Sequence, residues 1–452
     1  MRTGDLFDSP TSALYSPWMA GRIGFGEMRS LIGLGLCLQI GVAITSCGAE
    51  QAESPAETEE SPAEATPSVA ISESQEFGSP ETEREAPEAE GLGDALRSAL
   101  IVGAGDILFH QRILRSLREE RGGYDFVFRR IQDLIPEDAM AYANLETPLV
   151  RDVRDLDSTS PPILGADIAA APALRRAGFD LLGLANNHAF DQAAVGLDRT
   201  LEALRGAGLI AVGAGESEDA AYGHRVLESP SGLRVAWLGF TRHVNAGPGV
   251  GGVSKVARIG DERRMLRAVA AARDEADVVV AALHWGSDFV RGPRPWQREL
   301  ADRLVEGGVD LILGSGPHIL YEVERRESAR GDAVVAYSLG NFVSNQGLRY
   351  RVGGGRRPIT VPATQDGRGR DGALLYVDFI LEDERVQVRE LSWEPLWTQN
   401  NFLEVHGRDE LESAIFVAPL REANDVTQAE RLPIASAAIG EGVARRQGAG
   451  DR

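Results

Sequence analysis

Cysteine is almost absent from this chain of 452 residues: Cys37 and Cys47 are the only two, and everything from Gly48 onward lacks cysteine. The larger part of the chain therefore has no disulfide, no thiolate metal site and no cysteine nucleophile. Its 43% hydrophobic content is enough for a core, and its length suits one large domain or two ordinary ones.

Basic residues are outnumbered by acidic ones, 47 Lys and Arg against 68 Asp and Glu, which gives a formal net charge of −21. Proteins that bind nucleic acid usually carry a basic face, so we expect no nucleic acid among the partners. Much of the charge is local, because the segment from Glu50 to Glu90 holds thirteen Glu and one Arg.

The N-terminal region has the pattern of an export signal. Leu31–Ile44 is a mostly apolar run of fourteen residues preceded by Arg22 and Arg29. It is short for a membrane span and suits the core of a signal peptide. The Ile-Thr-Ser-Cys47 sequence that follows resembles a bacterial lipobox, so we expect residues 1–46 to be a lipoprotein signal peptide and Cys47 to be lipidated. An ordinary signal with a chance cysteine is the alternative.

The next segment, residues 47–97, is predicted to be a disordered acidic tether. Gln51–Gly91 is rich in Glu, Pro, Ala, Ser and Thr and poor in apolar residues. Such a composition cannot bury enough surface to offset its ordering entropy, and proline and like charges keep it extended. A lipid anchor and a spacer predict a membrane-anchored domain in the cell envelope, facing the periplasm or the exterior. The alternative is a disordered stretch with no role.

Short apolar runs then alternate with amphipathic stretches, which is typical of an α/β fold with a largely parallel sheet. The expected strands are Ala99–Ala104, Met140–Ala143, Phe179–Ala185, Leu209–Val212, Val235–Phe240, Val278–Leu283, Leu311–Leu313, Val334–Tyr337 and Leu374–Leu381. The expected helices begin at Ile113 or span Ala169–Ala177, Leu197–Gly206, Arg263–Ala276 and Pro295–Glu306. Less helix separates the strands after Glu322, which allows a second or mixed sheet.

Polar motifs follow the ends of six of these strands. They contain Asp106 and His110; Asn144 and Glu146; Asn186, Asn187 and His188; His284 and Trp285; His318; and Asn341. Ligands of α/β sheets bind beyond the carboxyl ends of the strands, so we expect one site. Asp, Glu, His and Asn suit a hard or borderline metal ion. Each motif alone also has a structural explanation, such as a helix cap or a turn.

Two histidines have particular chemical interest. His188 follows a wholly apolar strand and could act as a general acid, with Asp191 placed to orient its ring. His284 directly follows another apolar strand and is predicted to be a ligand, with Trp285 packing or stacking on substrate and Asp288 close by.

Two loops also stand out. Thr241–Lys255 is rich in glycine and could act as a flap. Gly347–Arg370 is rich in arginine and could steer an anionic substrate, although a solvated insertion is the simpler explanation. Its arginines are Arg349, Arg351, Arg356, Arg357, Arg368 and Arg370. We expect His224, His243 and His406 to be ordinary histidines, with a small reservation for His243.

Six short motifs, taken in order, resemble those of the CapA family of capsule and poly-γ-glutamate biosynthesis proteins. They are Gly-Asp, Asn-Leu-Glu, Asn-Asn-His, His-Trp-Gly, Pro-His and Tyr-Ser-Leu-Gly-Asn-Phe. The resemblance covers roughly Leu100–Trp397. It implies a four-layer α/β/β/α sandwich similar to the calcineurin-like metallophosphoesterases, here over residues 98–398. Residues 399–452 would be a partly helical C-terminal extension with a frayed end.

The resemblance also implies roles for individual residues. The positions that match metal ligands of the family are Asp106, Glu146, Asn187, His284 and His318, with His110 as a further candidate. His188 matches the histidine that contacts the leaving group. The expected substrate contacts are Asn144, Asn186, Trp285, Asp288 and Asn341. The metal would be Mn, Zn or Fe. The family usually has His-Pro-His where this chain has Gly316-Pro317-His318, so the number of bound metal ions, one or two, remains open.

We therefore expect an envelope protein that acts on an anionic polymer such as poly-γ-glutamate, by metal-dependent hydrolysis or transfer. One alternative is a non-catalytic protein that binds the polymer or a membrane-bound polymer synthase and supports export. The other is a metal-dependent phosphoesterase, which rests on fold analogy alone.

Overall fold

The computed structural model describes residues 96–117, 122–151, 163–245, 252–354, 365–405, 407–408 and 414–446. The predicted signal peptide, Cys47, all but the end of the predicted tether, and His406 lie outside the described residues. The described residues belong to one compact unit. Across these ranges, no helix is long and apolar enough to cross a membrane.

Hydrogen bonds link the strands of the described residues into one mixed 15-stranded sheet, whose main path runs β4-β3-β2-β1-β12-β13-β10-β8-β7-β6-β5. The strands are β1 (Arg97–Ile107), β2 (Met140–Leu145), β3 (Leu181–Gly183), β4 (Ile210–Val212), β5 (Arg225–Glu228), β6 (Arg234–Thr241), β7 (Val278–His284), β8 (Leu311–Ser315), β9 (Val323–Ser328), β10 (Gly331–Ala336), β11 (Asn341–Val343), β12 (Asp371–Glu382), β13 (Arg385–Asn400), β14 (Ile415–Pro419) and β15 (Ala444–Arg445).

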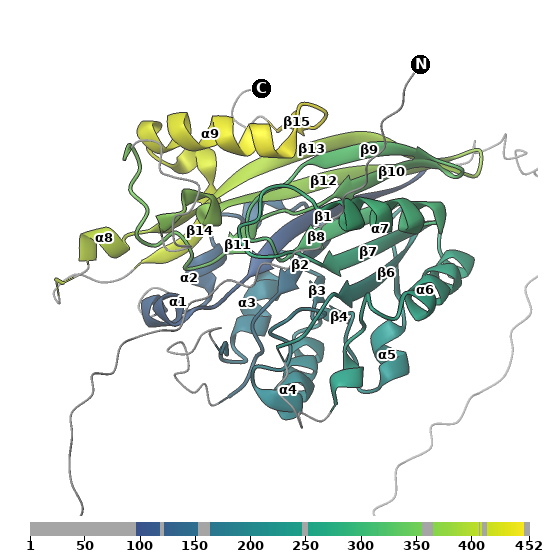
Figure 1. Cartoon of the computed structure of the whole chain (residues 1–452), viewed down its shortest axis with the longest axis horizontal. Coiled ribbons are helices and arrows are strands. Elements are labelled where there is room, and N and C mark those ends of the chain that lie inside the picture. Colours follow the sequence, from purple (N-terminus) through teal and green to yellow (C-terminus); the bar gives the residue numbers. More distant parts are fainter. Residues whose placement is uncertain are drawn as a thin grey trace, which may run out of the picture. The chain divides into compact units, whose positions relative to one another are not determined.

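The helices lie mainly in the connections between these strands (Figure 1). The α-helices are α1 (Gln111–Ser116), α2 (Asp125–Phe128), α3 (Ala170–Arg176), α4 (Ala193–Gly206), α5 (Glu218–Tyr222), α6 (Glu262–Glu275), α7 (Pro295–Glu306), α8 (Phe402–Val405) and α9 (Asp425–Ile439). Short 3₁₀ turns include η5 (Gly367–Arg370).

The sheet folds on itself in two halves. In the first half, β4, β3, β2 and β1 are parallel, and α3 and α4 are crossover helices. Strands β12 and β13 extend this half as antiparallel strands. In the second, β6, β7, β8 and β10 are parallel, with α6 and α7 as crossovers. The halves are joined where Gly331 of β10 pairs with Val386 of β13.

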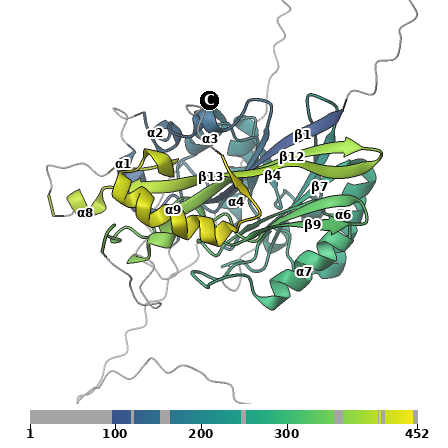
Figure 2. The same cartoon turned by 90° about the horizontal axis from the view of Figure 1, so that it is seen from above.

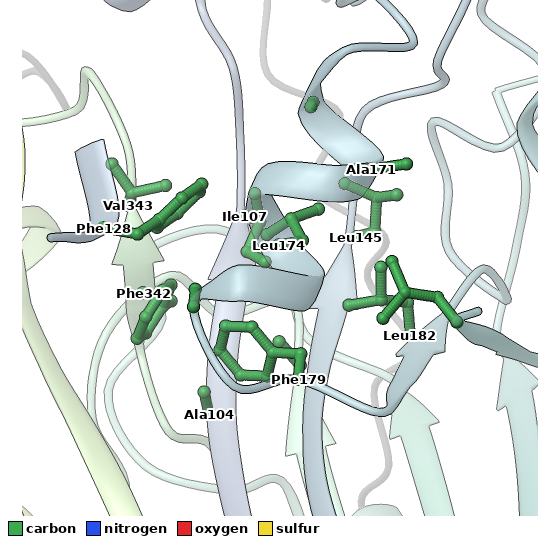
Figure 3. Close-up of a cluster of buried hydrophobic side chains, with 14 of the residues drawn as sticks. Ala104, Ile107, Phe128, Leu145, Ala171, Leu174, Phe179, Leu182, Phe342 and Val343 are labelled. Carbon is green, nitrogen blue, oxygen red and sulfur yellow. The ribbon is translucent and has the colours of Figure 1, made fainter. Parts of the chain in front are cut away.

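Three buried clusters define the layers. The first lies between α2–α4 and the outer face of the first half; Figure 3 shows Leu174 of α3 between Ile107 and Leu145. The second fills the space between the two halves, where the rings of Tyr142 and Trp237 stack with their centroids 5.9 Å apart. The third lies between the second half and α5–α7. The order is helix, sheet, sheet, helix, so the predicted four-layer α/β/β/α sandwich is confirmed.

The C-terminal region packs into the same body. Helix α9 lies across β12 and β13 (Figure 2), and its Ala435 and Ile439 belong to the cluster between the halves. Strand β14 pairs with β13, and Ile415 and Val417 of β14 are fully buried. The sequence pattern indicated a helix in this region but not this strand.

Most of the predicted elements occur with boundaries shifted by a few residues. The missed strands are β5, β9, β11, β13, β14 and β15, and all of them are short except β13, which has 16 residues. β9 reads Val-Glu-Arg-Arg-Glu-Ser and is stabilised as an outer strand by its pairing with β10 and by ion pairs such as Arg326–Glu324. Such a strand has no apolar run, so the sequence pattern could not reveal it.

We expect Val127→Ala in α2 to lower the free energy of unfolding by about 2 kcal/mol, because the side chain is fully buried in the first cluster and its methyl groups would leave a cavity. Val195→Ala in α4 is the matched control, since that side chain is 54% exposed. Urea unfolding of both variants tests this. An equal effect for the two would contradict the assigned core.

Candidate metal and acid-base site

The carboxyl ends of strands from both halves of the sheet meet at one place. Register sets Asp106 of β1 opposite Asn144 of β2 and Asn341 of β11, and it sets His284 of β7 opposite Ser315 of β8. The predicted convergence of the polar motifs therefore follows from strand pairing within each half.

Asp106, Glu146 and His318 join the two halves. Each offers one ligand atom, and these atoms lie within 4.8 Å of one another. His318 Nδ1 lies 3.0 Å from Asp106 Oδ2, and His318 Nε2 lies 3.9 Å from Glu146 Oε1. Both carboxylates are fully buried. The group is compact enough to hold one metal ion.

Glu146 is the most unusual member of this group. Its side chain is 0% exposed, yet neither Oε1 nor Oε2 has a hydrogen-bond partner among the described residues. His284 Nε2 lies 3.2 Å from Oε1 but is not aligned for a hydrogen bond, and in the part of the chain that the structure describes both nitrogens of His284 are buried without a partner. A buried, unpaired carboxylate beside a bare imidazole is costly unless a cation lies between them. These residues therefore fit a divalent metal ion.

Asp106, in contrast, accepts hydrogen bonds at both of its carboxylate oxygens. Its Oδ1 accepts a hydrogen bond from Asn144 Nδ2 at 2.8 Å, and its Oδ2 accepts one from the Gly316 N–H at 3.1 Å. Burial acts to raise the pKa of Asp106, but the hydrogen bond and charge of His318 outweigh it, so the pKa lies below its usual value. Burial likewise acts to lower the pKa of His318, yet Glu146 and Asp106 raise that pKa to about 10. The site thus favours positive charge.

His188 and Asp191 form a dyad beside this group. His188 Nδ1 lies 2.6 Å from Asp191 Oδ2, which also accepts the Leu164 N–H at 2.7 Å. A proton on Nδ1 donates to the carboxylate, and Nε2 lies 4.0 Å from Glu146 Oε1. Burial acts to lower the pKa of His188, but its hydrogen bond to Asp191 and the charges of Glu146 and Asp191 raise it overall.

The predicted amides support the site from within the protein. Asn186 Nδ2 donates to Asn144 Oδ1 at 3.3 Å and to Leu145 O at 2.9 Å, so Asn186 and Asn144 orient Asp106 as a chain. Both are almost fully buried, which suits positioning better than the predicted substrate contact. Asn187 Oδ1 is buried and has no hydrogen-bond partner among the described residues, so this amide oxygen remains a candidate ligand.

Two further predicted substrate contacts prove to be packing or loop-holding residues. Trp285 is 1% exposed, donates its indole N–H to Tyr337 O at 3.0 Å and stacks on the Tyr337 ring, so it has no face for a substrate. Asn341 Nδ2 donates to Gly369 O and to Gln346 Oε1, both at 2.8 Å, and holds the loops around the site together. Burial and these partners favour a structural role for both side chains over the predicted substrate contact.

Asp288 behaves as expected for a residue at the mouth of the site, because its side chain is 74% exposed and its Oδ1 lies 4.0 Å from His318 Nε2. His243, which the sequence left as an ordinary histidine, is also close: burial and the charges of His284 and Arg242 lower its pKa. In the sequence, the position of His243 after β6, whose end lies next to the end of β7, is the one feature that indicates its closeness to the site.

His110, a predicted ligand candidate, lies outside the group of Asp106, Glu146 and His318. Its Nδ1 accepts the Asn345 N–H at 3.2 Å, which requires a lone pair on Nδ1 and places the ring proton of the neutral imidazole on Nε2. Burial and the charges of His318 and His188 lower its pKa to about 3. In this arrangement the His110 ring is a donor, and its coordination of metal stays a prediction.

Gly316 occupies the position where the family resemblance implied a histidine. Its φ is +97°, a conformation that favours glycine, and a Cβ there would lie 3.0 Å from His284 Nε2. His284 thus takes the space that a side chain at this position would enter. His318 has a φ of +60°, so the ligand-bearing turn carries backbone strain, which is common at functional sites.

The predicted basic loop is only partly free to steer a substrate. Arg370 is buried, with its guanidinium 4.2 Å above the Trp397 ring, and Arg368 pairs with Asp366. Arg349 and Arg351 are exposed, whereas Arg356 and Arg357 lie outside the described residues.

Comparisons with known proteins agree with the motif order. Residues 100–346 match the family described as "Bacterial capsule synthesis protein PGA_cap". The chain is 32% identical over 273 residues to the capsule biosynthesis protein CapA of Bacillus anthracis and 29% identical over 263 residues to the PGA biosynthesis protein CapA of Bacillus subtilis. These matches cover 59% and 58% of this chain, but only 64% and 67% of the two relatives.

A probable polyglutamine synthesis accessory protein of Mycobacterium tuberculosis is 29% identical over 189 residues, covering 39% of this chain and 48% of that protein. Among solved structures, the calcineurin-like phosphoesterase YfkN of Bacillus subtilis matches 74% of this chain and 96% of its own, at 14% identity and a TM-score of 0.34. A likeness at that level says nothing about activity.

We expect Gly316→Ala to weaken binding of a divalent metal and to lower stability by about 1–3 kcal/mol, because a Cβ would strain the backbone and press on His284. Gly292→Ala is the matched control, since Gly292 also has a positive φ of +67° but open space around it. Calorimetric titration of both variants with Mn²⁺ separates strain from the contact with His284. Equal metal affinity in the two variants would contradict the geometry.

Proposed function

The chain belongs to the bacterial capsule synthesis protein family, and on this premise we propose that it acts in capsule or poly-γ-glutamate biosynthesis as a metal-dependent hydrolase or transferase on an anionic polymer. The single observation that supports a catalytic centre most strongly is the buried Glu146 carboxylate, which has no hydrogen-bond partner among the described residues and lies beside His284 and His318.

Glu146, His284 and His318 are the residues proposed to hold the metal, together with Asp106 and the amide oxygen of Asn187. Carboxylate, imidazole and amide donors in this combination suit Mn, Zn or Fe. A metal bound there would supply Lewis acidity and an activated water. Both oxygens of Asp106 also accept hydrogen bonds from N–H groups, so we assign it a second role in orienting the His318 ring.

His188 is the proposed general acid. Its Nδ1 is fixed by Asp191, and its Nε2 faces Glu146 across 4.0 Å, so a proton on Nε2 is directed into the site. Because its pKa is raised, a larger fraction of the His188 ring is protonated at neutral pH than for an ordinary histidine. His188 would donate this proton to the leaving oxygen or nitrogen of the polymer, and Asp191 would stabilise the orientation of the ring throughout.

The substrate class rests on the relatives. Two of them are named for capsule or PGA biosynthesis and a third for polyglutamine synthesis. We therefore propose an anionic polymer such as poly-γ-glutamate as the substrate and membrane polymer-synthase proteins as partners. Export, a lipid anchor at Cys47 and a location in the cell envelope are part of the same proposal and rest on the sequence outside the described residues.

A binding role without catalysis is the second candidate, and one observation favours it. Gly316 provides a backbone N–H to Asp106 where the resemblance implied a further ligand, so the site has lost one metal-binding side chain. A protein with a weak or single metal site could hold the polymer, or a synthase, without cleaving it.

We expect His188→Asn to lower turnover about 10²- to 10⁴-fold with little change in metal binding, because it removes the proton donor and leaves the carboxylates in place. The assay incubates protein and Mn²⁺, Zn²⁺ or Fe²⁺ with poly-γ-glutamate or with a phosphoester and measures new chain ends or released phosphate.

His224→Asn is the matched control, because His224 pairs with Glu275 outside the site. Turnover of the phosphoester alone would identify a phosphoesterase. The absence of turnover of either substrate by the wild type would favour the binding role, and an unchanged rate in His188→Asn would exclude His188 as the acid.

A further inference from the structure

A buried ion pair joins the C-terminal helix α9 to a strand that borders the site. Arg431 of α9 and Asp371, the first residue of β12, are 3% and 2% exposed. Arg431 Nε donates to Asp371 Oδ1 at 3.0 Å, and its Nη2 donates to the other carboxylate oxygen, so the pair is bidentate. Both residues lie beyond residues 100–346, which match the family, and the chemistry proposed above uses neither of them.

The residue before Arg431 holds a second segment near the site. Glu430 accepts the Gly353 N–H at 2.6 Å and also accepts the Tyr350 hydroxyl. Arg431 Nη1 donates to the same hydroxyl at 3.3 Å. Tyr350 and Gly353 come after β11, whereas Asp371 comes directly after η5. Two neighbouring side chains of α9 thus hold both described ends of the arginine-rich loop.

The Arg431–Asp371 pair borders the backbone that carries Asp106. Gly372 forms a bridge with Gly340, and the Gly340 carbonyl accepts the Asp106 N–H at 3.0 Å. A Cβ on Gly340 would come within 2.7 Å of the Asp371 carbonyl oxygen, so the two backbones are in direct contact. A shift of Asp371 is therefore passed on to Asp106 through Gly340.

A second path leads from the ion pair to His318. Gly369 lies two residues before Asp371, and its carbonyl accepts Asn341 Nδ2 at 2.8 Å. The same nitrogen donates to the His318 carbonyl at 3.3 Å. His318 has a φ of +60°, and a strained backbone of this kind persists only where its surroundings fix it. The η5 segment, held by Arg431, is part of those surroundings.

Stability alone does not account for an ion pair at this place. Well-packed apolar side chains of similar volume often replace a buried pair without loss of stability. A bidentate pair differs from them because it fixes direction as well as distance. Burial acts to lower the pKa of Arg431, but Asp371 and Tyr350 raise it overall, so the guanidinium stays charged.

We infer that Arg431 and Asp371 are positioning residues, which set the backbone of Asp106 and His318 for metal binding from a part of the chain outside the matched region. Arg431 acts through Asp371 and η5. The inference rests on the proposed function for the identity of the site as a metal site, whereas the positioning itself is measurable without metal.

The first test measures hydrogen exchange of the metal-free protein. The double variant Arg431→Met/Asp371→Leu replaces the pair by apolar side chains and should unfold in urea as the wild type does. We expect the amide of Asp106 to exchange roughly tenfold faster in this variant, because local opening at the site becomes easier. The amide of Val280, in the centre of β7, reports global unfolding and should exchange at the wild-type rate.

The second test is calorimetric titration with Mn²⁺. Loss of a partner that orients a metal ligand typically weakens metal binding by roughly 10- to 100-fold. Because Arg431 acts at one remove from the ligands, we expect binding about tenfold weaker, at the lower end of that range, in Arg431→Met and in the double variant alike. A purely structural role predicts instead that the double variant regains wild-type affinity together with its stability.

Arg273→Met is the matched control, because it breaks another largely buried ion pair at the opposite end of the sheet. Arg273 Nη1 donates to Asp310 Oδ2 at 2.6 Å, and Asp310 lies just before β8 begins. This variant should lose stability as Arg431→Met does, yet bind Mn²⁺ with wild-type affinity. Its amides at Asp106 and Val280 should exchange faster by the same factor.

Faster exchange at Asp106 with unchanged exchange at Val280, together with weaker Mn²⁺ binding in the double variant, supports the positioning role. Wild-type exchange at Asp106 in the double variant would overturn it, as would wild-type Mn²⁺ affinity in that variant or an equal loss of affinity in Arg273→Met. A wild-type protein that binds no Mn²⁺, but whose double variant shows the faster exchange at Asp106, would retain the positioning role and lose the proposed metal site.

Discussion

Burial of the Glu146 carboxylate is the constraint around which the rest of the site is arranged. The side chain is fully buried and neither oxygen has a hydrogen-bond partner among the described residues. A carboxylate in that position is expensive unless positive charge is brought to it. The sandwich does this by folding one sheet into two halves, so that His284 and His318 from the second half meet Glu146 from the first.

The histidines of the site differ in role because their Nδ1 partners differ. At His188 the partner is the Asp191 carboxylate, so Nδ1 donates and the ring gains basicity. At His318 the partner is Asp106, and the two surrounding carboxylates favour the charged ring. At His110 the partner is a backbone N–H, so Nδ1 accepts and the ring is a neutral donor. The same residue type thus differs in charge and in hydrogen-bonding role from one position to the next.

Sequence patterns could predict the layers and the meeting place of the motifs, because buried parallel strands are continuous apolar runs and their carboxyl ends lie at one edge. They could not predict which polar residues face the site. Trp285 follows His284 directly, yet strand alternation and its bond to Tyr337 turn it into the core. His110 has the residue type of a ligand, but a backbone contact from a segment 235 positions away decides its tautomer. Contacts of that range leave no local pattern.

The central claim is that Glu146, His284 and His318 form a metal site, and titration of metal-free protein with Mn²⁺ and Zn²⁺ tests it most directly. The comparison is between the wild type and Glu146→Gln, which keeps the size of the side chain and removes its charge. Near-stoichiometric binding in the wild type, lost in a variant that remains folded by thermal unfolding, is the predicted result. Absence of binding in the wild type, or unchanged affinity in Glu146→Gln, would contradict it.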